Sequence, residues 1–137
     1  AHFRQVVTVS AERMTAEDYA FKPTPDVRTF AQLVGHIADS NYLFCAIMKG
    51  ESRPSAVEKT MSKKAELQQA LEESFRYCEP ALLAMNGPGG REIVQFQRRS
   101  FPARAVMDFR NYHGFLHYGN VITYMRLRRK IPPSTEP

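Results

Sequence analysis

Two of the four histidines of this chain, His113 and His117, lie four positions apart in the stretch "NYHGFLHYGN" (111–120). If this stretch is helical, the two imidazole rings lie on one face, about one turn apart, and can reach a single metal ion. The alternative is a pair that packs beside the core and is satisfied by hydrogen bonds alone. Taken by itself, the spacing favours this alternative.

A third histidine changes the balance toward a metal site. His36 lies on an apolar stripe in "TFAQLVGHIADSNY" (29–42), where an imidazole without a partner would be costly. If its helix neighbours the helix of the pair, three imidazoles meet and leave a coordination position open, as in catalytic zinc sites. Imidazole ligands suit zinc, nickel, iron and copper, so they do not identify the ion. Gly114 replaces the glutamate that follows the first histidine of zinc proteases, which argues against proteolysis.

Apolar periodicity predicts four helices that could position these side chains. They span about residues 1–14, 29–49, 62–85 and 102–129. The second is the best defined, because Thr29 and Gln32 form a capping box and Gly50 is a typical stop signal. Pro80 should kink or split the third helix.

The segments between these helices are predicted as loops. Residues 51–61 are interpreted as irregular, and "REIVQFQRRSF" (91–101) as no more than an extended excursion. With four helices and no convincing strand, the expected fold class is all-α, a four-helix bundle. Bundles of this kind build metal sites from side chains on facing helices.

Length and composition predict one soluble domain over residues 1–137. The sequence starts without methionine and is helical at once, so its N-terminus is expected to be truncated within the first helix. No run of eighteen apolar residues suggests a membrane partner. Much of the net charge of +5 comes from "RLRRK" (126–130), which complements a helix C-terminus and lacks interleaved aromatic residues. A nucleic-acid partner is therefore not expected.

Cys45 and Cys78 occupy apolar helical positions without a CxxC pattern. This placement predicts reduced core thiols rather than a disulfide, and with them a cytoplasmic location.

Two segments of the chain, "RTFAQLVGHIADSNYLFCAIMKGE" and "NYHGFLHYGNVITYMRLRRKIPPS", resemble the DinB-like (DinB/YfiT) superfamily of metal-binding bacterial proteins. The resemblance implies an up-down-down-up four-helix bundle with His36, His113 and His117 as metal ligands, and a homodimer as the common assembly. Some members are S-transferases or isomerases that use a low-molecular-weight thiol, others are described as metal-dependent hydrolases, and many have no known activity.

The favoured hypothesis is an enzyme in which a divalent ion, zinc or nickel with iron as an alternative, activates a low-molecular-weight thiol or water toward a small-molecule substrate. Asp39 and Asn120 each lie three residues from a candidate ligand histidine, so they could contact the ligand rings or the substrate. Arg110 could bind a carboxylate, although an exposed helix arginine is the more ordinary interpretation. No side chain stands out as a catalytic base. The alternative is a non-enzymatic metal-binding or stress-response protein.

Overall fold

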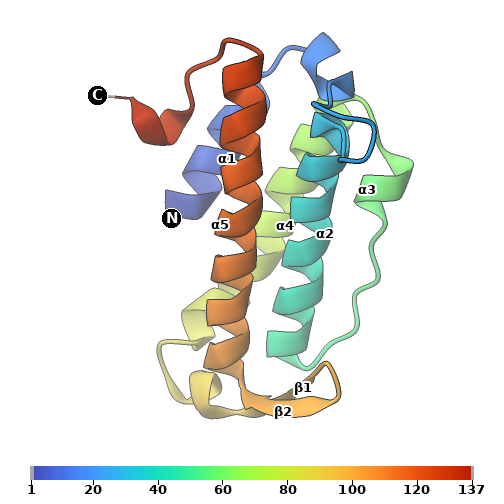
Figure 1. Cartoon of the computed structure of the whole chain (residues 1–137). Helices are drawn as coiled ribbons and strands as arrows, with labels where there is room; N and C mark the ends of the chain where they lie inside the picture. Colours follow the sequence, from blue (N-terminus) through green and yellow to red (C-terminus); the bar gives the residue numbers. More distant parts are fainter. Residues whose placement is uncertain (1, 137) are drawn as a thin grey trace.

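The computed structural model describes residues 2–136 and is mainly α-helical (Figure 1). Its four long helices are α1 (His2–Arg13), α2 (Phe30–Lys49), α4 (Lys64–Ala84) and α5 (Ala103–Leu127). A single turn, α3 (Val57–Thr60), and an antiparallel hairpin of β1 (Ile93–Phe96) and β2 (Arg99–Pro102) complete the main elements. Short 3-10 turns cover Glu17–Ala20, Pro88–Arg91 and Pro133–Thr135. α2 packs most extensively against α4 and α5, so it lies at the centre of the arrangement.

The ends of α2 are fixed as the sequence predicts. The Thr29 hydroxyl accepts a hydrogen bond from the Gln32 backbone N–H at 3.1 Å, and the Gln32 side chain accepts one from the Thr29 N–H at 2.8 Å. Gly50 follows the helix in the left-handed conformation with φ of 67°, which glycine adopts without a Cβ penalty. The capping box and the glycine stop are both confirmed, and they hold the helix that carries His36 in register.

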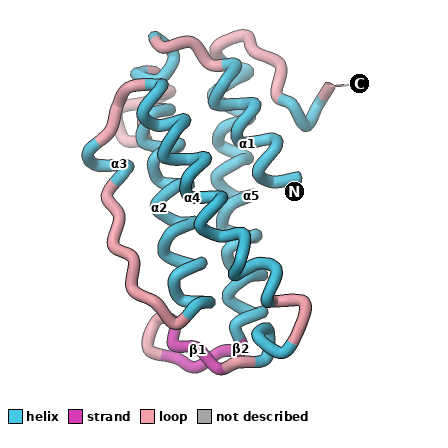
Figure 2. Tube along the Cα trace, turned by 180° about the vertical axis from the view of Figure 1, so that it is seen from behind, coloured by secondary structure: helices cyan, strands magenta, loops and turns pink. Residues whose placement is uncertain are grey.

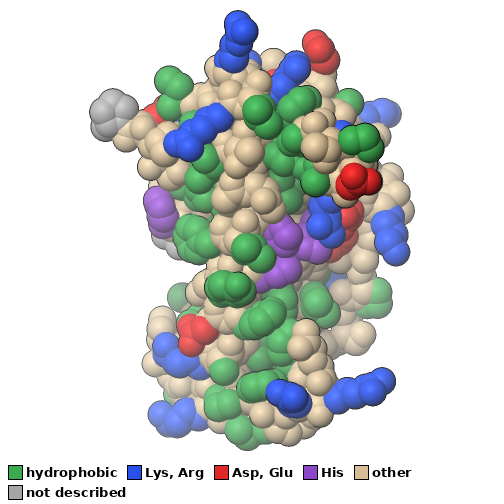
Figure 3. Space-filling model, viewed as in Figure 1, with side chains coloured by type: hydrophobic (Ala, Val, Ile, Leu, Met, Phe, Trp, Pro, Cys, Tyr) green, Lys and Arg blue, Asp and Glu red, His purple; other side chains and the backbone are tan. Residues whose placement is uncertain are grey.

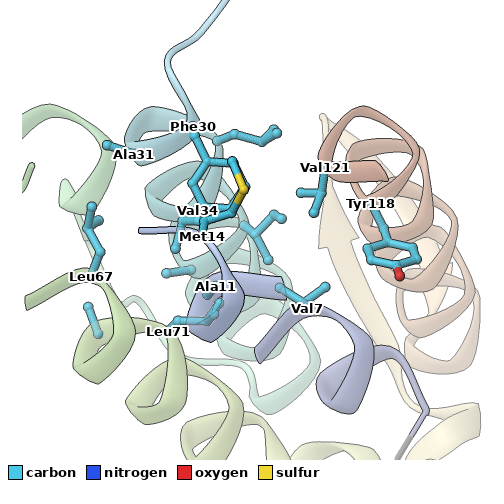
Figure 4. Packing of buried hydrophobic residues seen from close by; sticks show 14 of the residues in the cluster. Val7, Ala11, Met14, Phe30, Ala31, Val34, Leu67, Leu71, Tyr118 and Val121 are labelled. Carbon is cyan, nitrogen blue, oxygen red and sulfur yellow. The ribbon is translucent and has the colours of Figure 1, made fainter. Parts of the chain in front are cut away.

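The long helices share one apolar core (Figure 4). Each contributes buried side chains to it, which include Val7 from α1, Val34 from α2, Leu71 from α4 and Val121 from α5. A second buried cluster lies toward the hairpin end, where α2, α4 and α5 meet β1 and β2. Because α2 and α5 contribute to both clusters, their faces are held together along most of their length.

Two segments predicted as loops are in fact ordered elements. α3 forms inside residues 51–61, and Figure 2 shows that the segment before it runs back along α2. The hairpin forms inside residues 91–101 and extends to Pro102, with φ of 50° at Gln97 and 63° at Arg98. Two positive φ values are typical of a type I′ hairpin turn, whose two central residues are most often Asn-Gly. Without that signal, the sequence did not reveal the turn.

Pro80 does not split α4, which is one continuous helix from Lys64 to Ala84. The predicted split is wrong, because Cys78 and Ala81 are buried against the core and tertiary packing outweighs the lost backbone hydrogen bond. The alternative, a kink at Pro80, stays a prediction. Among residues 2–136, no helix combines the length and apolar character needed to cross a membrane.

The prediction of reduced cysteines is also wrong, because Cys45 on α2 and Cys78 on α4 form a disulfide. Their Cα atoms are 5.2 Å apart, within the range that a disulfide bridges. The sequence analysis placed each cysteine correctly in the core, but the pairing depends on α2 lying against α4, which periodicity alone does not give. The disulfide removes one argument for a cytoplasmic location.

Reducing this disulfide is expected to lower the free energy of unfolding by about 3–4 kcal/mol, because the bond closes a loop with a sequence separation of 33. Urea unfolding of oxidised and reduced protein, followed by circular dichroism, measures the difference. A thiol assay on denatured, unreduced protein is the control, and two free thiols per chain would contradict the disulfide itself.

Candidate metal centre

Three histidines from two neighbouring helices meet at one place. His36 lies on α2, and His113 and His117 lie one turn apart on α5. The Nε2 atoms of His36 and His113 are 3.3 Å apart, and the ring centroid of His117 is 4.5 Å from those of both other rings. One candidate ligand atom from each residue lies within 4.8 Å of the others. Figure 3 shows histidine side chains gathered in a hollow between α2 and α5.

The packing of α5 determines how deeply each ring is buried. A Cβ on Gly114 would lie 2.5 Å from the Phe3 ring, so the glycine allows α1 to pack directly beneath the histidine pair. His117 is buried, whereas His36 and His113 are half-buried. The two rings of the pair are therefore buried to different depths, and His117 lies deeper than His113. The cluster is open to solvent on one side.

The electrostatics of the cluster favour neutral rings at His113 and His117. Burial, together with repulsion from His36, lowers the pKa of His113, and burial with the neighbouring histidines lowers the pKa of His117 to about 4. Both rings are thus unprotonated near neutral pH and have lone pairs available for a metal ion. The buried Nδ1 of His117 has no hydrogen-bond partner among the described residues. Such a nitrogen is costly unless something binds it.

Glu58 on α3 orients His36. Its carboxylate lies 2.9 Å from His36 Nδ1, whereas the Arg28 guanidinium lies 3.4 Å from the same nitrogen. Because a carboxylate can only accept, the shorter contact favours a proton on Nδ1. In the neutral form of His36 with this proton, the lone pair is on Nε2, the atom 3.3 Å from His113 Nε2. Burial opposes ionisation of Glu58, but hydrogen bonds from Arg28 and His36 hold the pKa of Glu58 below its usual value. A carboxylate that fixes the tautomer in this way is common behind metal-ligating histidines.

Asp39 acts on the site through α3 and not by contact with a histidine. Its two carboxylate oxygens accept hydrogen bonds from the backbone N–H groups of Val57 at 2.9 Å and Glu58 at 3.0 Å. Gly35 makes room for this contact, because a Cβ there would lie 2.7 Å from the Cα of Glu58. Together, Gly35 and Asp39 hold α3 against α2 and so place Glu58 beside His36.

The other two predicted contact residues differ in position. Asn120 is exposed and lines a groove of about 600 Å³ together with Arg28 and Glu58. Arg110 is buried, so its interpretation as an exposed arginine is wrong. Its Nη2 donates to Asn41 Oδ1 at 2.7 Å, and burial lowers the pKa of its guanidinium to about 10.

Arg110 also borders a cavity of about 10 Å³ on the inner side of the pair, beside His113 and His117. That volume holds about one water molecule. Arg110 is therefore a structural cation beneath the site and is not accessible to a substrate carboxylate.

Sequence reasoning missed Ser40, Glu58 and Arg28. Ser40 Oγ lies 3.2 Å from His113 Nε2. The spacing of four residues from His36 could have revealed it, because residues i and i+4 share a helix face. Arg28 precedes α2, and Glu58 lies within α3. No local sequence pattern connects either residue to His36.

The three histidines fit a divalent ion. Two nitrogens bound to one tetrahedral ion at about 2.0–2.1 Å lie about 3.4 Å apart. The separation of 3.3 Å between the Nε2 atoms of His36 and His113 matches this value. Three clustered imidazoles, one of which has a buried nitrogen without a hydrogen-bond partner among the described residues, form a donor set that suits a divalent transition-metal ion.

Comparisons with known proteins agree with this architecture. The family model of the DinB superfamily matches residues 2–121. The crystal structure of a DinB-like protein from Bacillus subtilis superimposes with a TM-score of 0.74 at 20% sequence identity, covering 93% of this chain and 89% of that one. At this identity the likeness concerns the fold. No curated protein matches the chain.

Proposed function

Because the chain belongs to the DinB superfamily, we propose that it is a metal-dependent enzyme of the thiol S-transferase or hydrolase type, with the ion held by His36, His113 and His117. The observation that carries the proposal is the approach of two imidazole Nε2 atoms to 3.3 Å with a third ring 4.5 Å from both. We also propose the up-down-down-up bundle topology for this chain, and the packing of α2 against both α4 and α5 supports it.

The ion, when bound, would lower the pKa of a thiol or water in its open coordination position. The chain itself supplies orientation. Glu58 holds the proton on His36 Nδ1, and Arg28 donates to Glu58 at 2.7 Å and so balances its charge. Ser40 provides a hydroxyl group next to His113. Asp39 is poorly suited as a catalytic base, because both of its oxygens already accept backbone hydrogen bonds.

A catalytic role and a purely structural role for the ion differ in how much the fold depends on it. The buried core between the long helices does not involve the histidine cluster, so the domain should remain folded without metal. A structural or sensing role, the non-enzymatic alternative, would instead couple folding strongly to the ion.

Metal content and thermal stability test the proposal together. Untagged protein reconstituted with zinc or nickel and desalted should contain about one ion per chain by elemental analysis. After chelation, the far-ultraviolet circular dichroism spectrum should be unchanged at 25 °C and the protein should still melt cooperatively. Absence of stoichiometric metal would refute the site, and unfolding on chelation would favour the structural alternative.

A further inference from the structure

We infer that the organic ligand of this site is a small organic acid, and that Arg53 binds its carboxylate. The inference rests on the proposed function, because it concerns the molecule that would occupy the open side of the metal centre. Its basis is a groove lined by both a candidate metal ligand and an arginine that forms no direct ion pair among residues 2–136.

The groove opens beside His36. Its volume is about 310 Å³, and it is lined by His36, Asp39, Ser40 and Leu43 of α2 and by Arg53, Pro54 and Ser55 of the segment before α3. Pockets of this size accept small organic molecules. Since Ser40 also lies 3.2 Å from His113, the groove is continuous with the histidine cluster.

Aromatic rings hold the Arg53 guanidinium in place. Its Cζ lies 4.6 Å from the ring centroid of Tyr42 and 4.9 Å from that of Tyr77, within the range of cation–π interaction. A stacked guanidinium keeps its in-plane N–H groups free for bidentate binding of a carboxylate. Within residues 2–136, Arg53 makes neither a side-chain hydrogen bond nor a salt bridge to any acidic group.

The acidic groups near the groove make their direct contacts with other residues. The hydrogen bond from Lys49 is the main cause that lowers the pKa of the Glu51 carboxyl, and Arg53 acts on Glu51 only through its charge, which helps to lower that pKa. Asp39 accepts from the backbone of α3, and Glu58 accepts from Arg28 and His36. Glu51 pairs with Lys49 at 3.0 Å and accepts from the Tyr77 hydroxyl at 2.8 Å. Arg110 cannot take this role, because it is buried beneath the site. The groove therefore favours a ligand with an anionic group that binds Arg53 and a metal-binding group that reaches the ion beside His36.

Cobalt-loaded protein provides the test, because a thiolate bound to cobalt gives a charge-transfer absorption that can be titrated. The probes are 3-mercaptopropionate and its neutral isostere 3-mercaptopropionamide. Wild type should bind the acid about tenfold more tightly than the amide, a preference that weakens with added salt. Arg53→Gln should abolish the preference. Arg76→Gln should retain it, since Arg76 is an exposed arginine on α4 outside the groove.

The possible failures are distinguishable. If wild type does not bind cobalt, the proposed function fails and the inference fails with it. If cobalt binds but neither probe gives the absorption, or both bind equally, the metal site stands and the carboxylate subsite is refuted. An unchanged preference in Arg53→Gln would likewise refute it. If Arg76→Gln lost the preference for the acid to the same extent as Arg53→Gln, the preference would depend only on the overall charge of the protein, and the carboxylate subsite would be refuted.

Discussion

Replacing His113 with alanine is expected to weaken binding of zinc or nickel by at least about 100-fold, because it removes a nitrogen that lies 3.3 Å from His36 Nε2. The loss of a ligand should exceed the 10-fold to 100-fold effects typical of residues behind the ligands. Competition with a chromophoric chelator measures the affinity, and elemental analysis measures the stoichiometry.

The matched control is His2→Ala. His2 is the one histidine outside the cluster and is exposed on α1. Its removal should leave one ion per chain. Apo His113→Ala should unfold within about 1 kcal/mol of the apo wild type, because the ring is only half-buried. Equal metal content in wild type and His113→Ala would show that any bound ion lies elsewhere.

Replacing Gly35 with alanine is expected to damage the site without touching any histidine. The new Cβ would lie 2.7 Å from the Cα of Glu58, so α3 must move away from α2 and Glu58 must leave His36. We expect a loss of about 1–3 kcal/mol in the free energy of unfolding from the steric clash. Metal affinity should fall by about 10-fold to 100-fold as His36 loses its oriented lone pair.

Gly119→Ala is the matched control for Gly35→Ala. Gly119 is also a glycine within a long helix, but a Cβ there meets nothing within 4 Å. Alanine at this position should raise the free energy of unfolding by about 0.5–1 kcal/mol, because it restores ordinary helix propensity. Urea unfolding and chelator competition on both variants separate the two effects. If Gly35→Ala behaved like Gly119→Ala, α3 would not position Glu58.

The sequence predicted the elements whose signals are local. Thr29, Gln32 and Gly50 define α2, and four-residue spacing places His113 and His117 on one face of α5. His36 could be added because its position on an apolar stripe demanded a partner. These inferences use only residues within a few helical turns of one another. Over that distance, capping preferences and apolar periodicity are strong enough to be recognised in a single sequence.

The features that sequence reasoning missed depend on contacts between distant segments. Glu58 lies 22 residues from His36, and the disulfide joins cysteines with a sequence separation of 33. Both become visible only when α3 and α4 are placed against α2. The hairpin was missed for a different reason, because Gln97 and Arg98 adopt positive φ angles without the usual glycine.

The candidate metal centre is built from two parts of unequal stability, the long helices α2 and α5 and the short turn α3. The histidines lie on long helices that are packed into the core, whereas Glu58 is half-buried on a four-residue turn whose last two residues are exposed and which Asp39 holds against α2. A single helical turn at the surface, although it packs against α2, opens at a lower free energy than the whole domain unfolds. Local opening of α3 would release His36 Nδ1 while the bundle stays intact. The three histidines therefore keep their positions as long as the bundle is folded, whereas the hydrogen bond from His36 to Glu58 can break and re-form with each local opening of α3.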